Sequence, residues 1–539
     1  GNLTRMIVSI LLSRTAFIAT LRRDMASIED PDLYHVPAVR PPTLENLREL
    51  SQSMGLQCSD VELGVYEEYI AGTLRGYDRI SQLVGPSLPV KYPRTPGYRP
   101  SPDENTLNGW YWKCDIKGAD NGKLSGKTIG IKDNVAVAGV PMMNGSKLLE
   151  GYVPEFDATV VTRILDAGGR ILGKTNCEDL CMCGSSFTNV TGPTLNPHDK
   201  SRSSGGSSSG SAVLVAAGEI DMAIGGDQGG SIRIPASWCG IVGLKPTFGL
   251  VPYTGACPIE ITIDHLGPMA RNVHDCALLL EVISGPDGNN DSRHSNNFHV
   301  PEYTKQLQTE ITGKKIALIT EGFACCEQNV QDVVKETALK LSSKGALVEE
   351  VSIPLHKDGL AVWSAIALEG AYNCLYKGNG NGYHWKGYYP SSMQDALTRG
   401  FNLRPQDMSE TFKGVVLFGA FIQKNYQNKF YSKGQNLNIM LTAAYNKVLE
   451  EYDVLLMPTL TSVAPELPKK DSILKERLKA DSGMDVNCMP FNCTGHPAIS
   501  INAGKSLHGL PVGMMIVGRH FHEVSVLQIA YAYEQLQKI

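Results

Sequence analysis

Two serines, Ser207 and Ser231, stand 24 positions apart in a segment rich in glycine and serine, residues 201–235. The first third of this segment has the composition of a flexible linker. A helix-forming run closed by Gly218 and a strand-like run at Ile220–Ile224 follow it, however. A helix of about ten residues rises ~15 Å, and a strand of about five residues with its turn returns ~16 Å. We therefore expect the two serines to be neighbours, at a place where a hydroxyl could attack a carbonyl group.

A glycine-rich run directly before Ser231 indicates how such a carbonyl group could be held. Residues 225–230 read Gly-Gly-Asp-Gln-Gly-Gly, so the backbone has little side-chain bulk around it. Successive N–H groups of such a run can turn toward one point. An oxyanion hole needs donors of this kind, fixed in place before the carbonyl oxygen becomes charged.

A serine nucleophile also needs a base, and the twelve histidines include no evident Ser-His-Asp arrangement. Pairs of serine and lysine are a known alternative. Lys132 follows the strand-like run 128–131, and active-site residues of open sheets gather beyond the ends of strands. Burial there would favour the neutral amine, whose lone pair can accept a proton. Lys132 is the candidate base, although a single lysine after a strand is more commonly a surface residue.

Two other serine patterns point to different chemistry and are rejected. Residues 206–210 fit the G-x-S-x-G elbow of α/β-hydrolases, but that elbow needs a strand directly before it, and residues 196–204 form a polar loop. Ser472 and Lys475 fit S-x-x-K, but residues 471–479 are typical of a charged, solvated helix without partner motifs.

Composition narrows the classes of function. A net charge of −5 without clustered Lys and Arg argues against nucleic acid or a membrane as partner. The thirteen cysteines lack the C-x2-C spacing of a structural zinc site, so we expect reduced thiols, a cytoplasmic location, and no metal or other cofactor. Cys177, Cys181 and Cys183 could be soft-metal ligands but are better interpreted as small apolar side chains in a packed loop.

The elements that must position these residues alternate between strand-like and helical runs after Leu124. Strand-like runs occur at 128–131, 170–173, 454–457 and 511–517, and a helical run at 158–167. This alternation predicts the α/β class, with a mixed or parallel central sheet covered by helices on both faces. A helical insert without strand signals, at about 361–448, would cap the sheet.

The N-terminal part has a different pattern. Apolar residues recur at helical spacing from Thr43 to about Val84 and predict a small helical domain, and residues 86–102 hold six prolines and are interpreted as a linker. The predicted division is 25–100 for the helical domain and linker and 101–539 for the domain that carries the serines. Residues 1–24 are interpreted as a tag or targeting remnant, because the stretch is basic and contains Ser and Thr, and Met25 is a natural start. Its apolar stretch Met6–Leu12 is too short to span a bilayer.

Four motifs around these residues together resemble the amidase signature family. They are G-I-K-D-N at 130–134, G-G-S-S at 205–208, G-G-S-I-R-I-P at 229–235 and G-L-K-P at 243–246. The similarity continues through 453–465, 495–498 and 509–513, and the step from Ser207 to Ser231 equals that of the family. The resemblance covers about Leu124 to Ile539 and implies the amidase signature fold.

The resemblance implies a Ser-Ser-Lys triad in which Ser231 is the nucleophile, Ser207 relays its proton and Lys132 is the base. It also implies a cis peptide bond at Ser207. The remaining expected site residues fall into three groups: oxyanion-hole N–H groups of Gln228, Gly229, Gly230 and Ser231; Asp227 and Arg233, which brace that loop; and a substrate pocket at Cys181, Met182, Cys183 and Ser208.

Residues 226–231, 248–255 and 263–268 resemble bacterial amidases linked to nitrile hydratase and their fungal urethanase-like relatives. Those enzymes use an N-terminal helical segment in dimer contacts, which implies a homodimer. The expected activity is hydrolysis of small carboxylic amides to acid and ammonia through an acyl-enzyme. Two alternatives stay open: a urethanase that hydrolyses ethyl carbamate by the same triad, and a glutaminase-like subunit of a transamidosome, which the N-terminal helices and the insert argue against.

Overall fold

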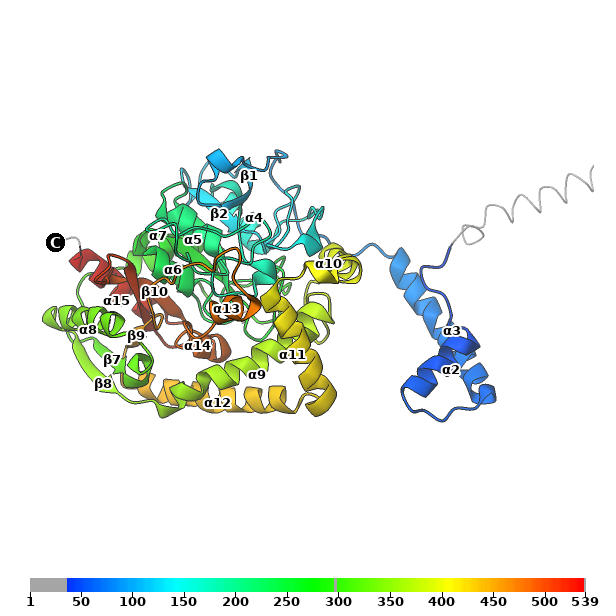
Figure 1. The fold of residues 1–539 in the computed structure, drawn as a ribbon. Coiled ribbons are helices and arrows are strands. Elements are labelled where there is room, and N and C mark those ends of the chain that lie inside the picture. The colour runs from blue at the N-terminus through cyan, green and yellow to red at the C-terminus, as the bar shows by residue number, and fades with distance from the viewer. Residues whose placement is uncertain (1–35, 295–297, 538–539) are drawn as a thin grey trace, which may run out of the picture. The chain divides into compact units, whose positions relative to one another are not determined.

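The computed structural model describes residues 36–294 and 298–537, and the chain divides into two compact units, residues 1–87 and 88–539 (Figure 1). The segment interpreted as a tag or targeting remnant, residues 1–24, lies outside the described residues. None of the helices in the described part of the chain is long and apolar enough to cross a lipid bilayer.

The described part of the N-terminal unit forms a pair of helices, α2 (Leu44–Ser53) and α3 (Asp60–Gln82), that contact each other. Each helix begins at a side-chain cap. The hydroxyl of Ser59 accepts the Glu62 N–H at 3.3 Å, and the Glu62 carboxylate accepts the Ser59 N–H at 2.7 Å, so both backbone donors are satisfied. Helix α3 leaves several large apolar side chains exposed, among them Val61, Val65, Tyr69, Tyr77 and Ile80.

The proline-rich segment interpreted as a linker belongs to the second unit from Leu88 onward. The indole N–H of Trp112 donates to the Pro96 carbonyl at 2.9 Å, and the Arg94 Nε donates to the Ala138 carbonyl at 3.1 Å. Prolines favour extended backbone, and an extended segment can lie along a folded surface through its carbonyl groups alone. Composition therefore indicated the extended conformation but not its docking.

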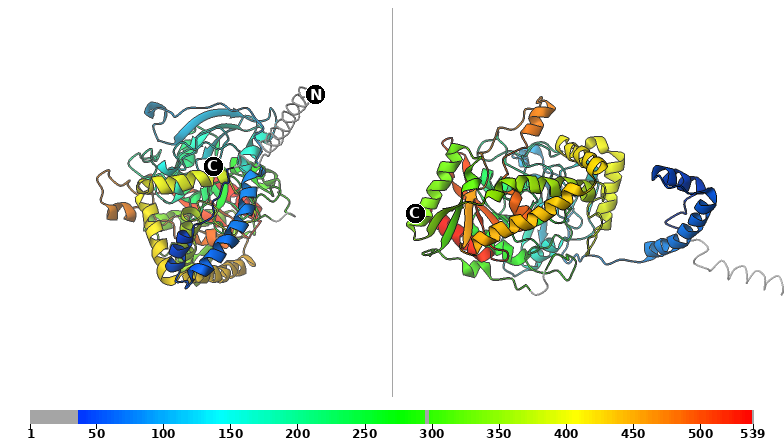
Figure 2. Two further views of the ribbon diagram at one scale, coloured as in Figure 1. Left: turned by 90° about the vertical axis from the view of Figure 1, so that its right-hand side faces the viewer. Right: turned by 90° about the horizontal axis from the view of Figure 1, so that it is seen from below.

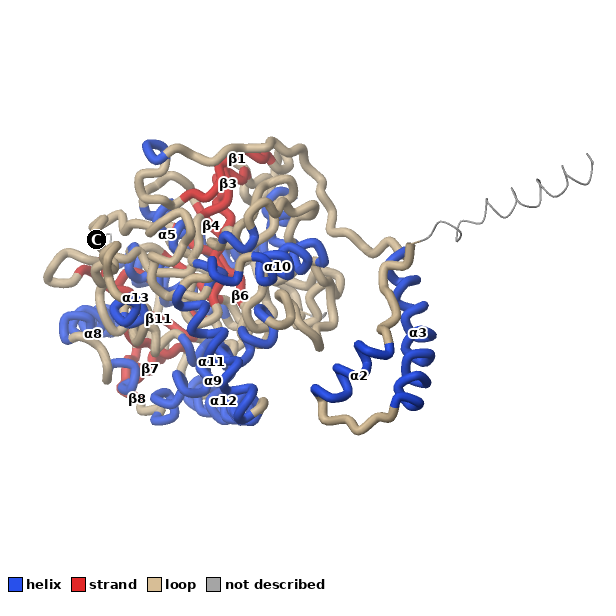
Figure 3. Tube along the Cα trace, turned by 45° about the vertical axis from the view of Figure 1, so that its right-hand side comes forward, coloured by secondary structure: helices blue, strands red, loops and turns tan. Residues whose placement is uncertain are grey.

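The second unit is built on an 11-stranded mixed sheet, in which the strands form one continuous band with β1 and β8 at opposite ends (Figure 3). Strand β2 pairs in parallel with β3 and β4, and β7 pairs in parallel with β8 and β9, whereas the other pairs are antiparallel. In sheet order the strands are β1 (Trp110–Lys117), β3 (Arg170–Thr175), β2 (Thr128–Lys132), β4 (Met222–Asp227), β6 (His265–Ala270), β5 (Val242–Lys245), β10 (Ala498–Lys505), β11 (Pro511–Val517), β9 (Val454–Pro458), β7 (Lys315–Ile319) and β8 (Leu347–Val351).

Helices cover both faces of this sheet, as the alternation of β4 shows. Ala223 packs with α5 (Ser209–Ala216) and α6 (Arg233–Cys239), whereas its neighbours Met222 and Ile224 belong to the cluster on the other face. Side chains of a strand alternate between the two faces, so both sides of β4 are buried. The second face is covered by α4 (Thr159–Asp166), α7 (Val273–Ile283), α8 (Gln328–Ser343) and α15 (Glu523–Leu536). The predicted α/β class with a mixed sheet covered on both faces is confirmed.

The helical insert consists of α9 (Gly359–Ala371), α10 (Ser391–Leu403), α11 (Glu410–Tyr426) and α12 (Lys429–Leu449), with a π-helical turn at Tyr372–Tyr376 after α9. Helix α9 contacts both α11 and α12, and Figure 2 shows the three gathered on one side of the second unit. Two short helices, α13 (Leu474–Lys479) and α14 (Met489–Thr494), lie against α11 and α9 respectively. This arrangement places the insert next to the loop that follows β4.

Candidate active site

Lys132 and Ser207 are joined by a direct hydrogen bond in the interior of the second unit. Lys132 is the last residue of β2, and its Nζ donates to the Ser207 Oγ at 2.8 Å and to the Gly226 carbonyl at 3.2 Å. Both side chains are fully buried. The peptide bond between Gly206 and Ser207 is cis. An amine and a hydroxyl held this way in a dry environment can exchange a proton.

The loops that carry Ser207 and Ser231 adjoin each other through their backbones. The Ser208 N–H donates to the Ser231 carbonyl at 3.2 Å, so the chain leaves along α5 and returns along β4 to nearly the same place. Strands β2 and β4 are parallel neighbours, and their carboxyl ends meet at one edge of the sheet. That edge brings Lys132 to Ser207, and the Ser208–Ser231 backbone hydrogen bond brings the loop of Ser231 to the same place.

Ser208, predicted to line the substrate pocket, does not do so. It is fully buried, its Oγ donates to the Gly226 carbonyl at 3.1 Å, and the Gly226 N–H donates back to the same oxygen at 3.2 Å. The side chain therefore ties the start of α5 to the end of β4. It follows Ser207 directly in the sequence, but it is not among the residues that line the pocket.

Asp227 and Arg233 form a buried ion pair under the loop that ends at Ser231. The Arg233 Nη2 lies 3.0 Å from Asp227 Oδ1, and both side chains are fully buried. Burial on its own would raise the pKa of Asp227, but the Arg233 guanidinium and the Asn492 amide lower it well below its usual value. Because the carboxylate stays charged, it can hold backbone N–H groups of the loop firmly.

One of those groups is the N–H of Gly230, which donates to Asp227 Oδ1 at 2.8 Å. This differs from the expectation that Gly230 supplies an oxyanion donor, because the carboxylate already occupies its N–H. Among the described residues, no protein acceptor takes the N–H groups of Gln228, Gly229 or Ser231. The backbone at Gly230 has a φ of +131°, and a Cβ there would lie 2.9 Å from the Cβ of Cys488, so the position requires glycine.

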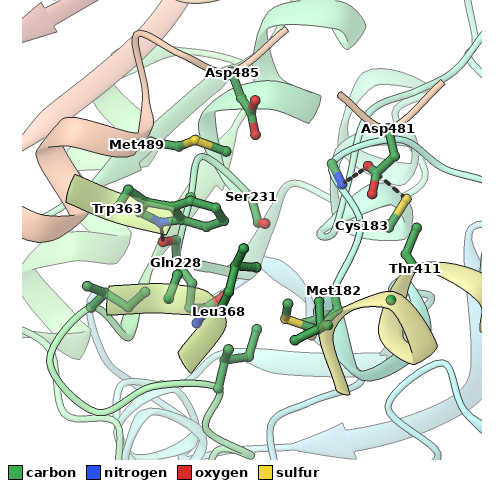
Figure 4. A pocket seen from close by; sticks show the side chains of 18 of the residues that line it. Met182, Cys183, Gln228, Ser231, Trp363, Leu368, Thr411, Asp481, Asp485 and Met489 are labelled. Carbon is green, nitrogen blue, oxygen red and sulfur yellow. Dashed lines mark hydrogen bonds between the residues drawn. The ribbon is translucent and has the colours of Figure 1, made fainter. Parts of the chain in front are cut away.

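Ser231 opens into a pocket of about 430 Å3 between the sheet edge and the insert (Figure 4). Its walls are mainly apolar. The insert contributes Trp363 and Leu368 from α9 and Val415 and Phe418 from α11. Cys181, Met182 and Cys183 are also among the lining residues, and Cys181 and Met182 pack in one hydrophobic cluster with Val415. No Lys or Arg is found among the described residues that line the pocket.

The cysteine group is a packed loop rather than a ligand cluster. The thiols of Cys177 and Cys181 both donate to Asn144 Oδ1, at 3.4 and 3.2 Å. Burial raises the pKa of Cys177, whereas for Cys181 the neighbouring Cys177 thiol, Lys132 and Ser207 outweigh burial and lower the pKa to about 7. Within the described ranges, no group of three or more His, Cys, Asp or Glu side chains is placed to hold a metal ion.

Sequence reasoning missed several polar groups around the site. Lys174 forms a fully buried ion pair with Asp133 at 2.9 Å. Glu178 accepts hydrogen bonds from Thr188 and Ser209, and burial raises the pKa of this carboxyl to about 7. Asp481 and Asp485 line the pocket, and burial raises their pKa values to about 6 and about 7. Asp133 stands in the motif at 130–134, but Lys174, Glu178, Asp481 and Asp485 stand in no pattern that differs from surface charges, so no local signal could have identified those four.

The two rejected serine patterns lie where the sequence analysis placed them. The segment before residues 206–210 is loop, and α5 begins only at Ser209. Ser472 precedes α13, and Ile473 and Leu474 at the start of that helix are mostly exposed. Neither pattern has the neighbours that its chemistry would require.

Comparison with known proteins agrees with this geometry. The family described as Amidase matches residues 110–527. An enantioselective amidase of Rhodococcus rhodochrous is 44% identical over 84% of this chain and 87% of its own length. The A subunit of the glutamyl-tRNA(Gln) amidotransferase of Methanosarcina acetivorans is 36% identical over 82% of this chain and 92% of its own.

A solved structure agrees as well. The native peptide amidase of Stenotrophomonas maltophilia superimposes with a TM-score of 0.62 at 29% identity, covering 77% of this chain and 84% of that one. The region that matches the family spans the sheet, the serine-bearing loops and Lys132. The chain therefore belongs to the amidase signature family of amide-hydrolysing enzymes.

Proposed function

We propose that the protein hydrolyses small carboxylic amides with Ser231 as nucleophile, Ser207 as proton relay and Lys132 as base. Ser231 Oγ attacks the amide carbonyl while its proton passes through Ser207 Oγ to the Lys132 amine. The tetrahedral intermediate expels ammonia, which receives the proton back through Ser207. Water then attacks the acyl-enzyme by the same relay and releases the acid.

The observation that carries this proposal is the 2.8 Å hydrogen bond from Lys132 Nζ to Ser207 Oγ in a fully buried setting. The backbone of the Ser231 loop supports the proposal. The N–H groups of Gln228, Gly229 and Ser231 can donate hydrogen bonds to the carbonyl oxygen as negative charge develops on it. The Asp227–Arg233 ion pair holds that loop in place, because Asp227 accepts the Gly230 N–H.

The pocket favours an apolar acyl group. Its volume of about 430 Å3 accommodates a phenyl ring, and most of its wall is aliphatic or aromatic. Free glutamine, the expected substrate of the glutaminase-like alternative, carries an α-carboxylate for which no cation is available among the described lining residues. Ethyl carbamate stays a second candidate, because a backbone oxyanion hole recognises a carbonyl oxygen whatever its neighbour.

The test is a comparison of kcat/KM for benzamide, propionamide, ethyl carbamate and glutamine on the purified protein. We expect benzamide to exceed propionamide because it buries more apolar surface, by a factor of roughly ten to a few hundred. The carbamate should be slower than propionamide, because its alkoxy oxygen donates into the carbonyl group. A carbamate faster than both amides would make the urethanase the better assignment, and glutamine as the best substrate would favour the transamidosome component.

The homodimer implied by the resemblance stays a prediction. The exposed apolar side chains of α3 support it, because they give the N-terminal unit a surface that a second copy could cover.

A further inference from the structure

The indole of Trp363 contacts the catalytic loop directly, although it comes from the insert. Its Nε1–H donates to the Gln228 carbonyl at 2.7 Å, which is the dashed line between Trp363 and Gln228 in Figure 4. The same ring packs over the next residue: a Cβ at Gly229 would lie 2.9 Å from the Trp363 Cζ2 atom. Trp363 therefore both binds the loop and requires glycine at position 229.

The hydrogen bond determines the direction of one N–H group. The Gln228 carbonyl and the Gly229 N–H belong to the same peptide unit, which is planar and trans, so the two groups point in opposite directions. When the indole holds the carbonyl on the side of the insert, the Gly229 N–H is directed away from the insert. A carbonyl that accepts a hydrogen bond also polarises its peptide unit and strengthens the N–H as a donor.

The loop needs such support because of its composition. Gly229 and Gly230 lack the side chains that would restrict their backbone, and on their own they would sample many conformations. Asp227 holds the Gly230 N–H at 2.8 Å on one side, and Trp363 holds the Gln228 carbonyl at 2.7 Å on the other. The Gly229 N–H belongs to the peptide unit that Trp363 holds, and Asp227 holds the next one.

We propose that Trp363 is a positioning residue for the oxyanion hole, acting through its indole N–H on the Gln228–Gly229 peptide unit. The inference rests on the proposed function, in which the Gly229 N–H donates a hydrogen bond to the negatively charged carbonyl oxygen. It gives the insert a part in the chemical step besides its part in the pocket wall. Val362 and Ile366 of the same helix are buried with Cys493 in one cluster, which fixes α9 and with it the indole.

The test replaces the indole by an isostere without the N–H, 3-benzothienylalanine at position 363, and uses Trp363→Phe as a second variant. We expect kcat for benzamide to fall about 10- to 100-fold, less than the loss of a whole oxyanion donor. KM should change by less than about threefold for the isostere, because the ring still fills its place. Inhibition by a boronic acid that forms a tetrahedral adduct on Ser231 should weaken by the same factor as kcat.

The matched control is Trp112. Its indole N–H also donates to a backbone carbonyl, that of Pro96, at 2.9 Å, but Trp112 does not line the pocket. The same isostere there should leave kcat unchanged. The inference would be overturned if the variant with 3-benzothienylalanine at position 363 had the kcat of the wild type. It would also be overturned if only KM changed in both position 363 variants. Ser231→Ala separates the two claims: if that variant is inactive while the isostere is fully active, only the role of Trp363 is wrong, and if Ser231→Ala is active, the proposed function itself is wrong.

Discussion

The two sides of the pocket are built in opposite ways. On the sheet side, Lys132 and Ser207 are fully buried polar groups, and nearby charges are paired, as in Asp227 with Arg233. On the insert side, Leu368 and Phe418 are apolar, and Phe418 is 41% exposed. Buried polar groups tolerate little change because an unpaired one costs about 1–3 kcal/mol or more. An apolar wall can exchange side chains at lower cost, so acyl preference can vary separately from the chemistry as long as Trp363, which contacts the Ser231 loop, is kept.

Removal of the proposed nucleophile, Ser231, is expected to give the largest effect and would place the chemistry on the sheet side. Ser231→Ala should lower kcat by at least ~10⁴-fold with the fold intact, because no other group can take the acyl chain. Steady-state kinetics would measure the loss of kcat, and circular dichroism would test whether the fold is intact. Ser472→Ala, at the rejected S-x-x-K pattern, is the control and should be fully active. An acyl or sulfonyl adduct found by mass spectrometry on Ser207 or a cysteine would contradict the assignment.

If Lys132 and Ser207 form the proposed proton relay, the losses of kcat that their substitutions cause should not be additive. Lys132→Ala and Ser207→Ala should each lower kcat by roughly 10³- to 10⁴-fold, and the double variant should be little worse than either single variant, because both belong to one proton path. A double-variant loss equal to the product of the single losses would show that the two residues act independently. Lys475→Ala provides a lysine control outside the site.

A buried carboxyl on the sheet side should make stability depend on pH. Burial raises the pKa of Glu178 from 4.5 to about 7, so the folded state holds the proton more tightly than the unfolded state. Its contribution is fully present below pH ~4.5 and is lost as pH rises through ~7, by about 3 kcal/mol in total. Urea unfolding at pH 5 and pH 8 should show the wild type losing stability relative to Glu178→Gln, which cannot titrate.

The control for that measurement is Glu451→Gln, at an exposed carboxylate after α12. The stability of Glu451→Gln to urea should change between pH 5 and pH 8 by the same amount as that of the wild type. A stability difference between wild type and Glu178→Gln that is equal at pH 5 and pH 8 would show that the Glu178 carboxyl titrates normally.

The smallest effect is expected on the insert side. Phe418→Ala should lower kcat/KM for benzamide by about tenfold and leave propionamide within about threefold, because one apolar contact in a pocket wall is worth only ~1–3 kcal/mol. Leu417→Ala is the matched control on the same helix, since Leu417 is 71% exposed and does not line the pocket. Equal losses for both amides in Phe418→Ala would mean that this wall also serves the chemical step.

The sequence alone was sufficient for the fold class and for the return of the chain from Ser207 to Ser231, whereas a single lysine after a strand, as Lys132 is, is more commonly a surface residue. Strand β2, helix α5 and strand β4 follow local patterns, and the lengths of α5 and β4 return the chain from Ser207 to Ser231. Each of these features lies in a continuous stretch, where propensity, period and glycine placement can be read directly.

Other features were decided only by the tertiary structure. Ser208 does not line the pocket, the Gly230 N–H donates to Asp227, and residues 88–102 are part of the second unit. The pocket wall and the Trp363 contact likewise join segments far apart in the chain. Such contacts depend on how the helices of the insert cross the sheet edge. No single stretch of sequence encodes that crossing, because it results from the packing of all the elements together.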